Sequence, residues 1–229
     1  MNLSLPLRWA ATPQEAFQIQ QELAAQVVTK GRPDPVRWVA GVDASVREGL
    51  AQAAIAILLY PELSLETHVT ATQPVRFPYV PGLLAFRELP PILEALQKLP
   101  LEPDVFLCDA QGVAHPRGLG LASHLGILIN KPTIGCAKSR LYGRPAASLP
   151  PERGSAVPLL NASGQTVGQV VRTRAGVKPI YVSVGHKVEL GWAVDFVLSC
   201  CRGLRLPEPT RQAHRLATLP RNTAGNRDV

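Results

Sequence analysis

Two aspartates lie within or directly after apolar segments that read as strands, where charged side chains are uncommon. Asp43 falls within the apolar segment Trp38–Ala44, and Asp109 directly follows the apolar segment Val105–Cys108. Burying a lone carboxylate is costly unless a cation or hydrogen bonds compensate. Neither segment contains Lys or Arg, so a divalent metal bound by hard oxygen ligands is the economical explanation. The alternative is that both aspartates are strand-end caps that face water.

Two further residues extend this candidate site. Glu88 lies on a predicted helical segment between the two aspartates, where a third carboxylate can converge on them. From the residues alone, a solvated helix position is the favoured interpretation of Glu88. Lys138 directly follows the short apolar segment Thr133–Ala137, so its ammonium group can reach a phosphate near the carboxylates. The alternative for Lys138 is an ordinary exposed lysine.

The histidines do not match a zinc site. His115 and His124 are nine residues apart, and the others are isolated along the chain: His68, His186 and His214. Structural and catalytic zinc sites use characteristic His and Cys spacings that are missing here. Oxygen-ligated Mg²⁺ or Mn²⁺ is therefore the predicted metal.

A glycine-rich stretch, residues 112–126, also has the composition of a binding loop. It contains Gly112, Gly118, Gly120 and Gly126 beside His115, Arg117 and His124. Glycines let backbone amides approach a phosphate or a base closely. The stretch lacks both the Walker lysine pattern and G-x-G-x-x-G, which argues against binding of a nucleoside triphosphate or a dinucleotide. A loop that serves only packing is the alternative.

The segment Pro78-Tyr79-Val80-Pro81-Gly82 places an aromatic and an aliphatic side chain between two prolines. Because proline fixes the backbone, this is a stiff apolar wedge that can push between stacked bases. Taken alone, the same residues are consistent with a proline-rich turn.

The length and composition favour one globular domain. The chain has 229 residues, of which 46% are hydrophobic, and we expect residues 1–229 to form a single domain whose last ten or so residues are disordered. No apolar run is long enough to cross a membrane, and the N-terminus lacks a signal-peptide pattern. The four cysteines make a poor disulfide framework, since two are adjacent and none forms C-x-x-C. A cytoplasmic location without membrane contact is therefore expected.

The charge is divided unevenly along the chain. The net charge is +7, and residues 110–188 carry ten basic side chains and a single acidic one, Glu152. Residues 1–109 carry twelve acidic and eight basic side chains. This division is expected if the carboxylates and a cradle for a polyanion are separate parts of the surface. The alternative is a merely basic surface.

The predicted elements describe an α/β fold. Short connections between strands at 36–46, 52–60 and 65–71 require a three-strand antiparallel meander, because a parallel connection needs a longer crossover. Helix and strand patterns then alternate as βαβ units, and the whole predicts a mixed sheet flanked by helices, of which the ribonuclease H-like arrangement is one example. The predicted helices are 13–30, 82–99 with an interruption at Pro90-Pro91, 119–129, 190–201 and 209–218, and the later strands are 105–109, 133–137, a hairpin at 157–174, and 180–184.

Together these segments resemble the endonuclease V family, from about residue 36 to residue 217. The resemblance rests on six motifs in order: VAGVDAS (39–45), PYVPGLLAFRE (78–88), DAQGVAHPRGLGLASHLG (109–126), IGCAKSRL (134–141), PIYVSVGHKV (179–188) and PTRQAHRLA (209–217). It implies a ribonuclease H-like fold and Mg²⁺- or Mn²⁺-dependent cleavage of the second phosphodiester bond 3′ of deoxyinosine, which leaves a 3′-hydroxyl and a 5′-phosphate.

The resemblance also implies roles for individual residues. Asp43, Glu88 and Asp109 match the metal-binding catalytic carboxylates, and His214 approaches the same site. The hypothesis that follows is that one or two ions held by these carboxylates position a water for in-line attack. Lys138 would offset charge that develops on the phosphate.

A second group of residues matches the parts of the family that handle the damaged base. Pro78, Tyr79, Val80 and Pro81 match its strand-separating wedge. Main-chain groups at Gly82, Leu84, Ala110, Gly120 and Leu121 match its pocket for the flipped base, with Ala110 where the family usually has glycine. His115, Arg117 and His124 are expected to make other DNA contacts.

The predicted partner is therefore DNA that contains deoxyinosine, bound by a monomer. Within the enzyme class, the alternative is an inosine-specific endoribonuclease. From a different class, the alternative is a catalytically silent nucleic-acid-binding protein, although three carboxylates beside a polyanion without a metal would be repulsive.

Overall fold

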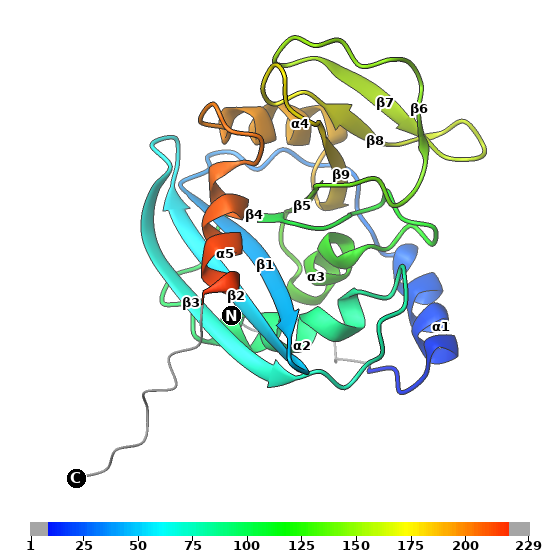
Figure 1. Ribbon diagram of the computed structural model, residues 1–229, viewed down its shortest axis with the longest axis vertical. Coiled ribbons are helices and arrows are strands. Elements are labelled where there is room, and N and C mark those ends of the chain that lie inside the picture. The colour runs from blue at the N-terminus through cyan, green and yellow to red at the C-terminus, as the bar shows by residue number, and fades with distance from the viewer. Residues whose placement is uncertain (1–8, 220–229) are drawn as a thin grey trace.

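A computed structural model describes residues 9–219, and the predicted disorder of the last ten residues lies outside this range. One nine-stranded sheet, with helices packed on both faces, runs through the molecule (Figure 1). The strands are β1 (Trp38–Arg47), β2 (Leu50–Leu59), β3 (Ser64–Pro74), β4 (Val105–Cys108), β5 (Thr133–Ala137), β6 (Arg144–Pro145), β7 (Ala156–Leu160), β8 (Thr166–Val171) and β9 (Ile180–His186). The helices are α1 (Pro13–Ala24), α2 (Ala85–Gln97), α3 (Leu121–Ile129), α4 (Leu190–Ser199) and α5 (Glu208–Thr218).

The order of the strands confirms the predicted meander and the mixed sheet. The order across the sheet is β3-β2-β1-β4-β5-β9-β8-β7-β6. β1, β2 and β3 pair antiparallel, and β4 and β5 then add in parallel beside β1. Strands β9 to β6 continue the sheet with antiparallel pairing. This mixed sheet is consistent with the ribonuclease H-like arrangement, which is one example of the predicted pattern and the fold that the family resemblance implies. Among residues 9–219, no helix is both long and apolar enough to span a membrane.

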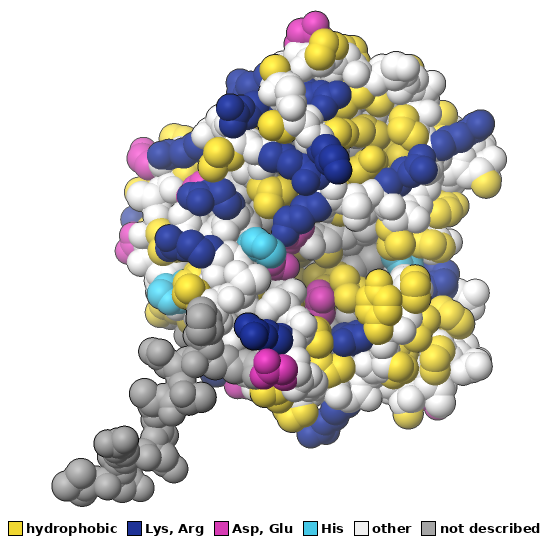
Figure 2. Space-filling view, viewed as in Figure 1, with side chains coloured by type: hydrophobic (Ala, Val, Ile, Leu, Met, Phe, Trp, Pro, Cys, Tyr) yellow, Lys and Arg dark blue, Asp and Glu magenta, His cyan; other side chains and the backbone are white. Residues whose placement is uncertain are grey.

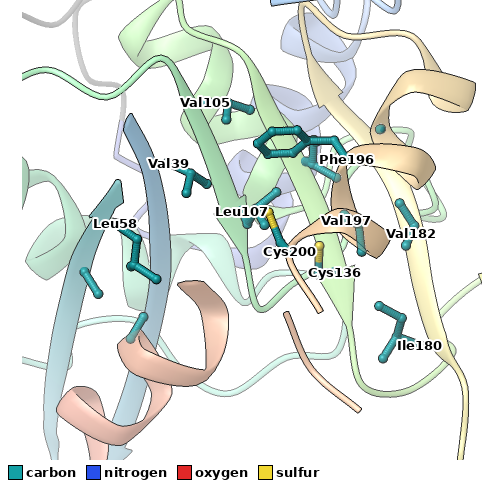
Figure 3. Packing of buried hydrophobic residues seen from close by; sticks show 14 of the residues in the cluster. Val39, Leu58, Val105, Leu107, Cys136, Ile180, Val182, Phe196, Val197 and Cys200 are labelled. Atoms are coloured by element: carbon teal, nitrogen blue, oxygen red, sulfur yellow. The ribbon is translucent and has the colours of Figure 1, made fainter. Parts of the chain in front are cut away.

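Each face of the sheet has its own apolar core. On one face Val39, Leu107 and Ile134 pack against α4 and α5, through residues such as Phe196 and Val197 (Figure 3). On the other face, Val42, Ile55, Phe106 and Cys108 meet α2 and α3. The central strands are therefore covered on both sides, which accounts for their nearly continuous apolar sequence.

Two local expectations are wrong, and one short strand was not expected. Helix α1 ends at Ala24 rather than near Lys30, because the following backbone pairs elsewhere: Val28 bonds with His186 and Lys187 at the end of β9. Helix α2 continues through Pro90-Pro91 without interruption. Its apolar face is buried against the sheet, and this burial outweighs the backbone hydrogen bonds that two prolines cannot donate. The two-residue strand β6 gave no recognisable pattern.

Helix α5 lies unusually close to β1, and a glycine makes this possible. A Cβ at Gly41 would lie 1.9 Å from the carbonyl oxygen of Pro209. Further along both elements, His214 bonds to Asp43, and the Ser45 hydroxyl donates to the carbonyl of Ala217. From Gly41 to Asp43 the strand advances by roughly 6.6 Å. From Pro209 to His214 the helix advances by about 7.5 Å, which is nearly the same length. The contact at Gly41 therefore brings position 214 level with position 43.

Gly41→Ala is expected to lower the free energy of unfolding by about 1–3 kcal/mol, the usual cost of overpacking, since the added methyl meets backbone atoms that cannot swing aside. Denaturant unfolding measures the change. Gly191→Ala is the matched control, because a Cβ there meets no atom within 4 Å and the residue lies in α4. Equal stability of the two variants would contradict the close packing of α5 on β1.

Candidate active site

Asp43 and Asp109 lie side by side on neighbouring parallel strands. Val42 is paired with Cys108 across β1 and β4, and the amide of Asp109 donates to the carbonyl of Val42 at 3.0 Å. Both aspartate side chains are largely buried, 11% exposed for Asp43 and 5% for Asp109. Two carboxylates forced together in this way repel one another, so the surrounding groups must compensate.

Part of the compensation comes from two other elements. Lys138, directly after β5, forms an ion pair with Asp109. His214, on α5, has its Nδ1 2.6 Å from Oδ2 of Asp43 and 3.3 Å from Nζ of Lys138. One ring nitrogen cannot donate to Asp43 and accept from Lys138 at once, and the shorter contact to a carboxylate makes Nδ1 the donor to Asp43. The strands themselves lack cations, as the sequence indicates, but the fold supplies them from β5 and α5.

Glu88 brings a third carboxyl into the same pocket, outside the close group that Asp43, Asp109 and His214 form. It lies in the first turn of α2 and lines the pocket together with both aspartates. Burial raises the pKa of Glu88 to about 8, and the charges of Asp43 and Asp109 act in the same direction. Burial also raises the pKa of Asp43 to about 6, helped by Asp109 and opposed by His214 and Lys138. Glu88 is therefore not the solvated helix residue that its sequence context alone favours.

The donor set fits a divalent cation. Asp43, Asp109 and His214 each offer a ligand atom within 4.8 Å of the others, the one such group among residues 9–219. Carboxylate oxygens dominate the site, which suits Mg²⁺ or Mn²⁺. Burial first, and the neighbouring carboxylates second, raise the pKa values of Asp43 and Glu88, and a bound cation would favour the charged form of both.

The acidic groups line an open pocket of about 440 Å³. All five residues predicted for the base pocket line it: Gly82, Leu84, Ala110, Gly120 and Leu121. Three of the four wedge residues line it as well, namely Tyr79, Val80 and Pro81. A volume of this size accommodates a small organic group, so the carboxylates and a ligand-sized cavity share one site.

Tyr79 stands out from the protein at the rim of this pocket. Its side chain is 71% exposed, unusual for an aromatic residue, and the guanidinium of Arg87 lies 5.5 Å from its ring centre. Arg87 is adjacent to Glu88 on α2. The same turn of helix therefore supports the exposed ring and carries the third carboxyl.

The three residues predicted to make other DNA contacts lie in different environments. His115 lines the pocket, and Arg117 donates to the carbonyl of Gly82 at 2.9 Å behind it. His124 is 2% exposed and packs edge-on against Phe86, 5.5 Å between ring centres. A ring buried in this way cannot reach DNA, so its position does not support that prediction for His124.

Some pocket residues were not singled out from the sequence. Arg140 and Leu141 line the pocket beside Lys138, and their place in the IGCAKSRL motif was the available signal. Gln20 lines it from α1, with no motif to indicate its role. Figure 2 shows acidic side chains at a hollow near the middle of one face, with Lys and Arg side chains gathered above them.

Without metal, the protein is expected to lose stability as the pH rises from 6 to 8. The pKa of Glu88 in the folded protein is about 8, well above its unfolded value of about 4.3. The folded state thus holds this proton more tightly, and the stabilisation is complete below the unfolded pKa and lost as the pH rises through the folded one.

Unfolding in EDTA should show a loss of about 2 kcal/mol between pH 6 and 8, and Glu88→Gln should remove most of this slope. Addition of Mg²⁺ should reverse the trend in the wild type. An identical slope in the wild type and in Glu88→Gln would contradict the buried position of Glu88 among the acidic groups.

Comparison with known proteins agrees with this geometry. The sequence profile of the Endonuclease V family matches residues 21–215. An endonuclease V from Gloeobacter violaceus is 50% identical over 217 residues, which cover 93% of this chain and 88% of that protein. One from Dehalococcoides mccartyi is 49% identical over 211 residues, 91% of this chain and 94% of that protein.

Solved structures give the same result. The endonuclease V of Streptomyces avermitilis superposes with a TM-score of 0.86 at 43% identity, covering 95% of this chain and 96% of that one. The catalytic domain of human endonuclease V gives 0.82 at 36% identity, with coverage of 89% and 93%. An endonuclease V from Ciona intestinalis, in complex with a 24-mer DNA that contains an inosine followed by a ribo-adenosine, gives 0.77 at 31%, with coverage of 89% and 95%. The chain belongs to the endonuclease V family of nucleases.

Proposed function

We propose that this protein is a DNA repair endonuclease that recognises a flipped deoxyinosine and hydrolyses the second phosphodiester bond 3′ of the lesion. The products would be a 3′-hydroxyl and a 5′-phosphate. The observation that carries the proposal is the shared pocket, which is lined by Asp43, Asp109 and Glu88 and by the exposed Tyr79. A nuclease that acts beside a flipped base needs both parts within reach of one nucleotide strand.

The choice of substrate rests on a relative. The Ciona intestinalis protein binds inosine-containing DNA, and it shares 31% of its residues with this chain over nearly the whole fold. Three of the five residues predicted for the base pocket are glycine or alanine, which suits recognition through backbone amides, because small residues let the main chain approach the base. Inosine-containing DNA is therefore the proposed substrate.

The proposed cofactor is Mg²⁺, for which Mn²⁺ can substitute, held by Asp43, Asp109 and Glu88. When bound, one or two such ions supply the positive charge that phosphodiester hydrolysis needs and lower the pKa of a water. Asp43 and Asp109 provide oxygens that are fixed by the pairing of β1 with β4. The raised pKa of Glu88 keeps it protonated until a cation is present, which limits repulsion in the empty site.

Lys138 and His214 complete the proposed chemistry. The Lys138 side chain is 34% exposed, so its ammonium group can face a phosphate while it remains beside Asp109. It would offset the charge that develops on the phosphate. His214 holds a proton on Nδ1 toward Asp43, which fixes the direction of that carboxylate.

Base recognition is proposed to begin with weak pairing. Extruding a base costs a few kcal/mol, and least where pairing is already poor, as for hypoxanthine opposite a mismatched partner. Tyr79, between Pro78 and Val80, would fill the space that the extruded base leaves. The carbonyl of Gly82 already accepts hydrogen bonds from protein side chains. The backbone N–H of Gly82 is therefore the group that would bond to the base. An N–H suits the keto oxygen of hypoxanthine and not the amino group of adenine.

The setting of the reaction is also a proposal. One chain supplies every group named above, so we propose that a monomer is active. The four cysteines are free and buried, which suits a reducing compartment such as the cytoplasm.

Asp43→Ala and Asp109→Ala should still bind a duplex that contains inosine, yet nick it at least about 100-fold more slowly with Mg²⁺, since each removes a charged oxygen ligand. Gel-based nicking and binding assays measure both properties. Asp195→Ala is the control, because Asp195 is an exposed residue of α4 away from the pocket. Wild-type rates in either active-site variant would remove the metal assignment.

The same assay separates the alternative functions. Matched inosine oligonucleotides of DNA and RNA should show faster cleavage of DNA. Preferential cleavage of RNA would make the protein an inosine-specific endoribonuclease. Metal-independent binding with no cleavage of either would make it a nucleic-acid-binding protein without catalytic activity.

Tyr79→Ala should weaken the affinity for inosine DNA about tenfold by removing a stacking surface, while the melting temperature stays within about 1 °C because the ring is exposed. Tyr79→Phe keeps the ring and should retain the affinity. Fluorescence anisotropy and thermal melting provide the two readouts. Unchanged affinity of Tyr79→Ala would count against the wedge.

A further inference from the structure

A buried glutamine of α1, Gln20, forms hydrogen bonds with two distant segments of the chain at the base pocket. Gln20 is 1% exposed, although most glutamines lie at the surface. Its Nε2 donates to the carbonyl of Gly82 at 2.9 Å and to the carbonyl of Leu119 at 3.1 Å. Its Oε1 accepts from Nε of Arg117. Every hydrogen-bonding group of this amide is therefore engaged, and its partners lie 62 to 99 residues away.

The carbonyl of Gly82 is the common target of three side chains. Besides Gln20, Nη2 of Arg117 donates to it at 2.9 Å, and Nε2 of His115 lies 2.9 Å away. The amide of Arg117 donates to Nδ1 of His115, so the proton of this ring is on Nε2 and points at Gly82. Burial and the charge of Arg117 lower the pKa of His115 to about 4, which keeps that ring neutral.

Gly82 has a backbone conformation that residues with a side chain rarely adopt. Its φ is +79°, and a Cβ would lie 2.8 Å from Nη2 of Arg117 and 3.3 Å from Nε2 of His115. The donors thus close around the backbone itself, at a position that only glycine adopts readily. The loop that carries Tyr79 is therefore anchored immediately after the wedge.

The two carbonyls that Gln20 holds belong to two segments that are distant in sequence, one within the pocket lining and one directly before it. Gly82 and Leu84 form the side next to the wedge, and Gly120 and Leu121 form the side at the start of α3. Leu119 directly precedes Gly120. One amide with two fixed N–H directions therefore sets the separation of two backbone segments that would contact a flipped base.

We infer that Gln20 is the positioning residue that sets the width of the base pocket and so determines which base is accepted. The inference rests on the proposed function. Gln20 acts through Gly82 and Leu119, while the carboxylates are held by β1, β4 and α2. Its loss relaxes the shape of the pocket without moving the acidic groups.

Gln20→Leu tests the inference, and Gln20→Met is a second variant of similar length that also cannot hydrogen-bond. Gln21→Leu is the matched control, since Gln21 is exposed on the same helix. Binding is measured in EDTA to a duplex with inosine and to the same duplex with guanosine at that position. The ratio of the two affinities should fall at least about fivefold in both Gln20 variants and stay unchanged in Gln21→Leu. In nicking assays with Mg²⁺ the loss should appear in KM rather than in kcat.

The outcomes separate this inference from the proposed function. A wild type that neither prefers nor nicks inosine DNA would overturn the proposed function. A wild type that does both, with the preference intact in Gln20→Leu and Gln20→Met, would overturn the inference alone. An equal loss of affinity for both duplexes, or failure of both variants to fold, would show a structural role for Gln20 and would likewise overturn it.

Discussion

The repulsion between Asp43 and Asp109 is the constraint on which the rest of the structure depends. Parallel pairing of β1 with β4 sets the two carboxylates next to each other, largely out of water. Such a pair is unfavourable by itself. The fold compensates with Lys138 from the end of β5 and His214 from α5, and it holds Glu88 with a raised pKa nearby. Each of these residues is placed by a different element, so the site requires the three neighbouring strands β1, β4 and β5 and the two helices α2 and α5.

The same constraint explains why α5 must approach β1 so closely. The helix can deliver His214 only if its first turn lies against the strand, and Gly41 provides the space for the carbonyl of Pro209. The opposite face of the sheet is served by α2, which presents Glu88 in its first turn and supports Tyr79 through Arg87. Glu88 and Arg87, whose guanidinium lies against the exposed ring of Tyr79, are thus adjacent residues of one helix.

The sequence indicates those features that depend on local pattern. An aspartate inside an apolar strand is conspicuous, and short connections leave an antiparallel meander as the one available geometry. Glu88 is different, because a helix position does not reveal whether tertiary packing will bury it. The burial of His124 could not be predicted for the same reason, since packing buries every residue of its helix α3. The role of Gln20 could not be predicted for a further reason. Two of its partners are backbone carbonyls distant in sequence, and no side-chain pattern marks them.

Locating the metal by anomalous scattering from crystals grown with Mn²⁺ addresses the acidic site most directly. The arrangement of the carboxylates predicts a strong peak within bonding distance of side-chain oxygens of both Asp43 and Asp109, on the side that faces Glu88. A peak elsewhere, or an acidic site without one at saturating Mn²⁺, would contradict the view that these three side chains are brought together to hold a metal.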